Sequence, residues 1–174
     1  ALSIAQAAVR AGPDRAANHV TLGFVASSAG DKALARSAYR KALELRRADP
    51  GETSAEYADT LHNLATIFRD TGRLDEAGPM FQQALDVFRT VAGEESPGYV
   101  GTLQSLALLS QARGEYDRAE EHLRRALDAS PQRIGGLIDL AKFLAQQGRF
   151  QESDQHLAKA EKINLHIQRR GDTI

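Results

Sequence analysis

The sequence predicts an all-α fold, a solenoid of antiparallel helix pairs without β-strands. Four turn glycines, Gly30, Gly72, Gly114 and Gly148, recur at separations of 42, 42 and 34 residues. Small residues stand at fixed distances from each glycine, and the apolar residues on both sides of it follow helical spacing. The 174 residues therefore form a single repeat array.

The positions around the glycines have distinct packing roles. Each glycine lies where one helix stops, a place that commonly needs the left-handed conformation that only glycine adopts at little cost. The alanines that recur before and after it let two antiparallel helices approach closely, and an aromatic residue fills the wedge between them. Besides the four glycines, these structural positions include Ala65, Ala77, Phe81, Ala107 and Ala119.

The elements can be assigned in chain order. Residues 1–15 predict the second helix of a truncated repeat, which Pro13 ends. Residues 16–57, 58–99 and 100–133 predict three complete repeats, each with one helix on either side of its glycine. Residues 134–174 predict a degenerate fourth repeat, in which Ser153 takes an alanine position, with a C-terminal extension of its last helix. About nine helices follow from this division.

The start of the chain suggests a segment of a longer protein. The first residue is Ala1 rather than methionine, and the sequence begins within a repeat. Stacked repeats bury a continuous core, so a truncated first repeat exposes apolar side chains. We expect the segment to self-associate through this face, which comprises Leu2, Ile4, Ala5 and Val9.

Composition excludes several classes of function. The 22 Lys and Arg residues balance 23 Asp and Glu, so the sequence lacks the basic excess expected of a nucleic-acid-binding protein. No apolar run approaches the length of about 20 residues that crosses a bilayer, so no membrane insertion is expected. Cysteine is absent, which excludes disulfides and thiolate chemistry but leaves the compartment open, with the cytoplasm favoured.

The glycine, alanine and Phe-x-x-Ala positions resemble the tetratricopeptide repeat, whose period is 34 residues. The 42-residue spacings are similar to the kinesin light chain type of this repeat, especially in the stretch TLHNLATIFRDTGRLDEA, residues 60–77. The family's tryptophan position is occupied by His19, Leu61, Leu103 and Leu137 instead. The resemblance implies a right-handed superhelix, in which the first helix of each repeat lines a concave groove that binds peptides or helices of protein partners.

The resemblance also places the candidate groove residues, ten, nine, six and three positions before each turn glycine. Asn63 matches an asparagine of the kinesin light chain type that binds peptide backbone, and an amide can both donate and accept. The carboxylate clamp that other members use for acidic chaperone tails does not fit, because its positions hold Val20 and Phe24. The candidates for partner binding are Phe24, His62, Asn63, Thr66, Arg69, Gln104, Leu108, Gln111 and Lys142.

The sequence predicts no catalytic residues, no metal ligands and no cofactor. His122 and His156 are expected to be solvated on the convex side, one repeat apart and too distant to share a metal. The leading functional hypothesis is therefore a protein–protein interaction scaffold that is not an enzyme. Two alternatives stay open, a structural or sensor module within a larger bacterial regulator, and an accessory domain of an enzyme whose catalytic part lies outside this segment.

Overall fold

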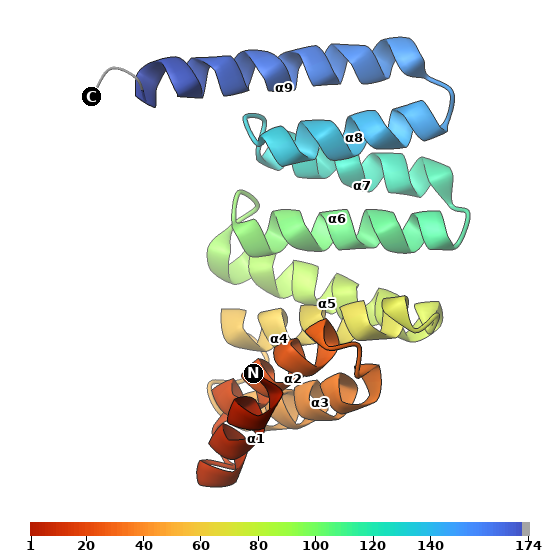
Figure 1. Ribbon diagram of the computed structural model, residues 1–174. Helices are drawn as coiled ribbons and strands as arrows, with labels where there is room; N and C mark the ends of the chain where they lie inside the picture. Colours follow the sequence, from red (N-terminus) through yellow and green to blue (C-terminus); the bar gives the residue numbers. More distant parts are fainter. Residues whose placement is uncertain (172–174) are drawn as a thin grey trace.

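A computed structural model describes residues 1–171 and shows nine α-helices and no strand in that part of the chain (Figure 1). The predicted all-α solenoid is thereby confirmed, and the end of the expected C-terminal extension, residues 172–174, lies outside the described residues. The helices are α1 (Leu2–Ala11), α2 (Ala16–Ser28), α3 (Lys32–Ala48), α4 (Ala55–Asp70), α5 (Leu74–Ala92), α6 (Pro97–Ala112), α7 (Tyr116–Ala129), α8 (Ile134–Gln146) and α9 (Phe150–Gly171).

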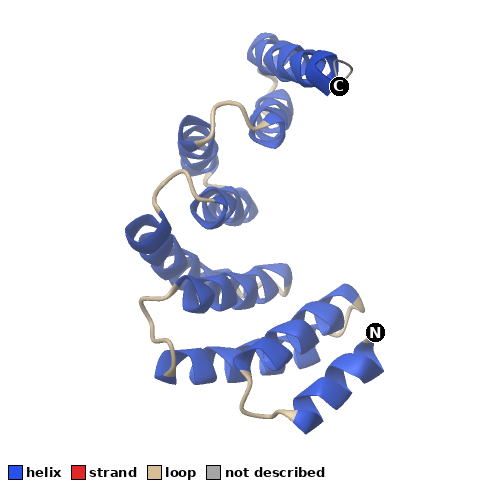
Figure 2. Cartoon of the chain, turned by 90° about the vertical axis from the view of Figure 1, so that its left-hand side faces the viewer, coloured by secondary structure: helices blue, strands red, loops and turns tan. Residues whose placement is uncertain are grey.

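Each helix packs mainly against its neighbours in the chain, so the molecule is a one-dimensional stack. The pairs α2–α3, α4–α5, α6–α7 and α8–α9 each fold back around one turn glycine, and α1 packs on α2. Figure 2 shows that the stack bends into an arc rather than running straight. A direct contact between α4 and α6 links first helices of successive pairs.

The four turns have the same geometry. Their glycines have φ angles between 75° and 83°, which confirms the left-handed conformation expected there. In each turn the residue after the glycine donates its N–H to a carbonyl five residues earlier, as in the bond from Arg73 to Phe68. This is the Schellman pattern, which satisfies a carbonyl that the helix end leaves unpaired.

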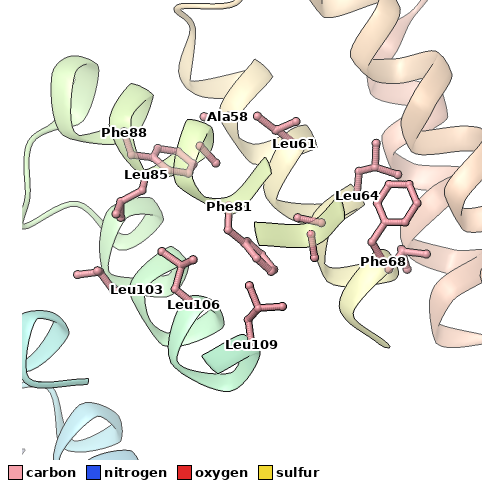
Figure 3. Packing of buried hydrophobic residues seen from close by; sticks show 14 of the residues in the cluster. Ala58, Leu61, Leu64, Phe68, Phe81, Leu85, Phe88, Leu103, Leu106 and Leu109 are labelled. Carbon is pink, nitrogen blue, oxygen red and sulfur yellow. The ribbon is translucent and has the colours of Figure 1, made fainter. Parts of the chain in front are cut away.

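The small residues lie where the helices meet. Ala65, Ala77, Ala107 and Ala119 have no exposed surface. Phe81 is also fully buried, and it points from α5 toward Leu106 and Leu109 of α6 (Figure 3). One aromatic residue therefore joins one helix pair to the next.

Two helices start earlier than the repeat pattern suggests. The helices α4 and α6 begin at Ala55 and Pro97, three residues before the predicted repeat starts at 58 and 100. The cause is local, because Ser54 and Ser96 cap these helices by accepting hydrogen bonds from the N–H groups of residues 57 and 99. By contrast, α2 and α8 begin at residues 16 and 134, where repeats were expected to start.

The last pair departs from the others at its outer edge. Ser153 is buried in the position that alanine holds elsewhere, so a small polar residue is tolerated there. Leu157, which occupies the position of Phe81, keeps 44 % of its surface exposed, because it has no following helix pair to pack on among the described residues. This pair therefore presents apolar surface at the end of the stack.

Candidate functional site

A pocket between α6 and α8 brings together four of the nine sequence-predicted groove residues. Its volume is about 290 Å³, and the four are Gln104, Leu108, Gln111 and Lys142. They come from the first helices of two successive pairs, as the repeat register predicts. The side chain of Leu108 is 51 % exposed although it lies on a helix with a largely buried surface, so it is available for contact.

A hydrogen bond ties the two walls of this pocket together. The Nε2 atom of Gln104 donates to Oδ2 of Asp139 at 2.6 Å, which links α6 to α8. The pocket is thus lined by three amides, one carboxylate and one ammonium group together with apolar side chains. Such a mixture can hold a segment that offers both polar backbone groups and an apolar side chain.

Four lining residues of this pocket were not among the sequence-predicted candidates, namely Leu123 of α7 and Asp139, Phe143 and Gln146 of α8. Gln146 stands one turn after Lys142. A helical residue covers the same face as the residue four positions earlier. Extending the predicted positions by one turn would therefore have found Gln146.

Three of the four candidates on α4, namely His62, Thr66 and Arg69, are already engaged within the protein. The Nε and Nη2 atoms of Arg69 both donate to Oδ1 of Asp70, at 3.2 and 2.8 Å. The hydroxyl of Thr66 donates to the carbonyl of His62 at 3.0 Å. Asn63 is half-buried and its side chain makes no hydrogen bond among the described residues. Of this group, the Asn63 amide has the most unused hydrogen-bonding capacity.

The His62 side chain is largely buried where α4 faces α6. Its Nδ1 is 3.0 Å from Oγ1 of Thr102, and its ring meets the ring of Phe81 edge-on with centroids 5.3 Å apart. Burial, reinforced by the positive charge of Arg69, lowers the pKa of His62 to about 4. The imidazole is therefore neutral at physiological pH and connects two helix pairs.

Phe24 stands apart from the other candidates. It lies on α2 with 66 % of its surface exposed, and it lines none of the pockets described in this part of the chain. The structure thus supplies an exposed aromatic residue near the N-terminal end of the stack, separate from the α6–α8 pocket.

His122 corrects the expectation of a solvated convex histidine. It is half-buried, and its Nδ1 has no hydrogen-bond partner among the described residues. The reason is that residues of α5 and α6 lie beside His122. It lines a pocket of about 450 Å³ together with them, including Pro79 and Leu109. Burial, and after it the charge of Arg125, lowers the pKa of His122.

Two further observations concern metal binding and membrane insertion. In residues 1–171, the structure places no three His, Cys, Asp or Glu residues together in a way that could hold a metal ion. None of the helices described is sufficiently long and apolar to cross a membrane.

Comparison with known families and structures agrees with the repeat architecture. One profile described as tetratricopeptide repeat matches residues 14–89 and 56–132, and a second with the same description matches residues 110–166. No curated protein matches the sequence.

Solved structures of similar fold share little sequence with the chain. BtubC (BKLC) from P. vanneervenii has a TM-score of 0.78 at 22 % identity, over 88 % of this chain and 64 % of its own. A putative kinesin light chain with TPR-like repeats from Podosopora anserina has a TM-score of 0.73 at 20 % identity, covering 89 % and 77 %. MamA has a TM-score of 0.70 at 18 % identity, covering 97 % and 89 %. The chain thus spans less than two thirds of BtubC, and the likeness shows the fold alone.

Proposed function

Because the chain belongs to the tetratricopeptide repeat family, whose members are in general protein–protein interaction modules, we propose that it captures a peptide segment of a partner along its concave surface. Repeats of this family are typically non-catalytic scaffolds. The observation that carries the proposal is the α6–α8 pocket, where Gln104, Leu108, Gln111 and Lys142 surround one cavity.

The chemistry of the pocket suits an extended chain. Every peptide unit of an extended segment presents one N–H donor and one carbonyl acceptor. The amides of Gln104, Gln111 and Gln146 can satisfy both kinds of group, since an amide donates and accepts. The exposed side chain of Leu108 offers an apolar contact between them. A segment with one apolar anchor flanked by polar backbone fits this arrangement.

The helix α4 would extend the same site by one repeat. Asn63 occupies the position on α4 that Ser105 occupies on α6, and its amide has no internal partner among the described residues. Arg69 is held by Asp70, so a partner carboxylate would have to share that guanidinium. We therefore expect Asn63→Ala to weaken binding more than Arg69→Ala does.

A quantitative pull-down tests the proposal. Leu108→Ser removes the apolar contact in the pocket, while Tyr116→Ser is the matched control at the start of α7. The two side chains are equally exposed, at 51 % and 50 %, so both variants remove similar apolar surface. Partners of the wild type should be depleted by Leu108→Ser and retained by Tyr116→Ser. If both variants lost the partners equally, or if neither variant lost them, a structural module would be favoured over a peptide-binding groove.

A further inference from the structure

The last helix extends well beyond the helix on which it packs. The helix α9 has 22 residues and α8 has 13, and Figure 1 shows the C-terminal part of α9 projecting past the start of α8. Beneath this projection lies a pocket of about 670 Å³. One wall of the pocket is the connection between α7 and α8, at Pro131 and Gln132, and the other wall is α9.

The α9 wall has an apolar strip. Ile163 packs partly against the core that α8 and α9 share, and Ile167 stands one turn further along. Ile167 keeps 56 % of its surface exposed, because α8 begins at Ile134 and does not reach beneath it. An apolar strip that continues past its covering helix, with polar residues around it, is typical of an interaction surface.

The charges around this strip have one sign. Lys159 and Lys162 line the pocket together with the imidazole of His166, and no carboxylate of the described residues lines it. Asp154 and Glu161 belong to the same helix but lie outside the pocket. Among the described residues, the ion pairs of α9 involve only Glu152 in its first turn. The two ammonium groups are thus available to an external anion.

From the charge and the apolar strip together we infer a second docking site beneath the end of α9, which takes an acidic segment of a partner protein that carries apolar side chains. Carboxylates of the segment pair with Lys159 and Lys162, and an apolar side chain lies against Ile163 and Ile167. The site shares no residue with the α6–α8 pocket. Its recessed shape, between a helix and a loop, favours a protein segment over the flat surface of a lipid bilayer.

The test uses short synthetic peptides and the isotope-labelled chain. A peptide of glutamate and leucine is titrated against the chain, and amide chemical shifts are followed by NMR. One comparison peptide has lysine in place of glutamate, and a second has serine in place of leucine. Shifts should be confined to residues 131–132 and 159–167. Both comparison peptides should bind weakly, since each lacks one half of the required chemistry.

Charge reversal identifies the residues responsible. The double variant Lys159→Glu with Lys162→Glu should weaken binding about ten-fold. The control is Lys41→Glu with Arg89→Glu, which changes the net charge equally at two side chains on α3 and α5 that are 43 % and 54 % exposed. Ile167→Ser should weaken binding several-fold without a change in charge.

Three results would overturn the inference. Equal affinity in the two double variants would mean that only net charge matters. Shifts centred on Leu108 would assign the peptide to the α6–α8 pocket instead. The third result is a wild-type chain that does not bind the glutamate–leucine peptide but co-sediments with phosphatidylserine vesicles. If Lys159→Glu with Lys162→Glu abolished that co-sedimentation, the ligand would be a lipid surface.

Discussion

Ala65 shows how tightly the helices of one pair meet. It has no exposed surface, and neither has Ala77 on the opposing helix. A larger side chain has no space there without shifting a helix. We expect Ala65→Leu to lower the free energy of unfolding by roughly 1–3 kcal/mol, measured by urea denaturation. Ala33→Leu on the exposed side of α3 is the control and should change little. An unchanged stability in Ala65→Leu would mean that the register of the helix pair is wrong.

His62 gives the protein a sensitivity to acid. Its pKa is lowered from 6.5 to about 4 in the folded protein, chiefly by burial. Between these values the unfolded chain binds a proton at this residue that the folded protein does not. The contribution of the neutral His62 to the free energy of unfolding is therefore fully present above pH 6.5, and it is lost as the pH drops toward 4.

A variant isolates this contribution. In His62→Gln the position no longer titrates, while an amide can still bond to Thr102. Between pH 7 and about pH 4.5, the wild type should lose on the order of 3 kcal/mol more than the variant, because each pKa unit is worth about 1.4 kcal/mol. Parallel stability curves for the two proteins would show that His62 is solvated in the folded state.

Some side-chain contacts could be predicted from the sequence, and others could not. The buried alanines and Phe81 could be predicted because every repeat makes the same contact with its neighbour, so the pattern recurs along the chain. The His62–Thr102 bond could not, since it joins residues 40 positions apart through their individual rotamers. The unpartnered Nδ1 of His122 is likewise set by how α7 packs beside α5 and α6.

At the scale of elements, capping serines set where the longer helices begin. Ser54 accepts a hydrogen bond from the N–H of Tyr57, and the additional turn buries the Tyr57 ring to 1 % exposure. Glycine and alanine positions mark helix ends and contacts between helices, and they leave the first turn of α4 undetermined. The sequence therefore predicts the number of helices well and these starts less well.

Removing the cap tests its contribution. Ser54→Ala should lower the free energy of unfolding by about 1 kcal/mol, because the first turn of α4 loses a side-chain acceptor. Thr53→Ala, at the exposed neighbouring position before the helix, is the control and should be neutral. Thermal or urea denaturation of both variants provides the measurement, and equal stabilities would argue against a role for the cap.

At the scale of the whole molecule, the ends of the stack differ from its middle. Ile4 on α1 is 73 % exposed, whereas core residues of the inner helices such as Leu64 and Leu103 are buried. Of the face expected at Leu2, Ile4, Ala5 and Val9, Ala5 is buried and Leu2 and Val9 are half-buried against α2 and α3, so that part of the expectation was wrong. Self-association through α1 remains our prediction, and it requires apolar contact at Ile4. Ile4→Glu should therefore reduce any concentration-dependent association seen by sedimentation velocity. Association that persists unchanged in this variant would point to another surface.

The site could be predicted from the sequence only in part. The four residues of the α6–α8 pocket follow from the repeat register, which places equivalent positions of successive first helices side by side. Phe24 lies on α2, two helix pairs before α6, so the register itself separates it from that pocket. The ion pair of Arg69 with Asp70 depends on local rotamers, which the repeat pattern does not determine. The projecting end of α9 depends on how far that helix continues beyond α8.

Site-specific photocrosslinking tests most directly whether a partner lies on the concave surface. A photoreactive phenylalanine analogue replaces Leu108 in one protein and Tyr116 in another, since both positions are about half exposed. After irradiation with partner-containing extract, we predict a discrete adduct at position 108 that is absent at position 116, with the crosslink in one continuous segment of the partner. Adducts at 116 alone, or at neither position, would contradict the proposal that the α6–α8 pocket captures a peptide.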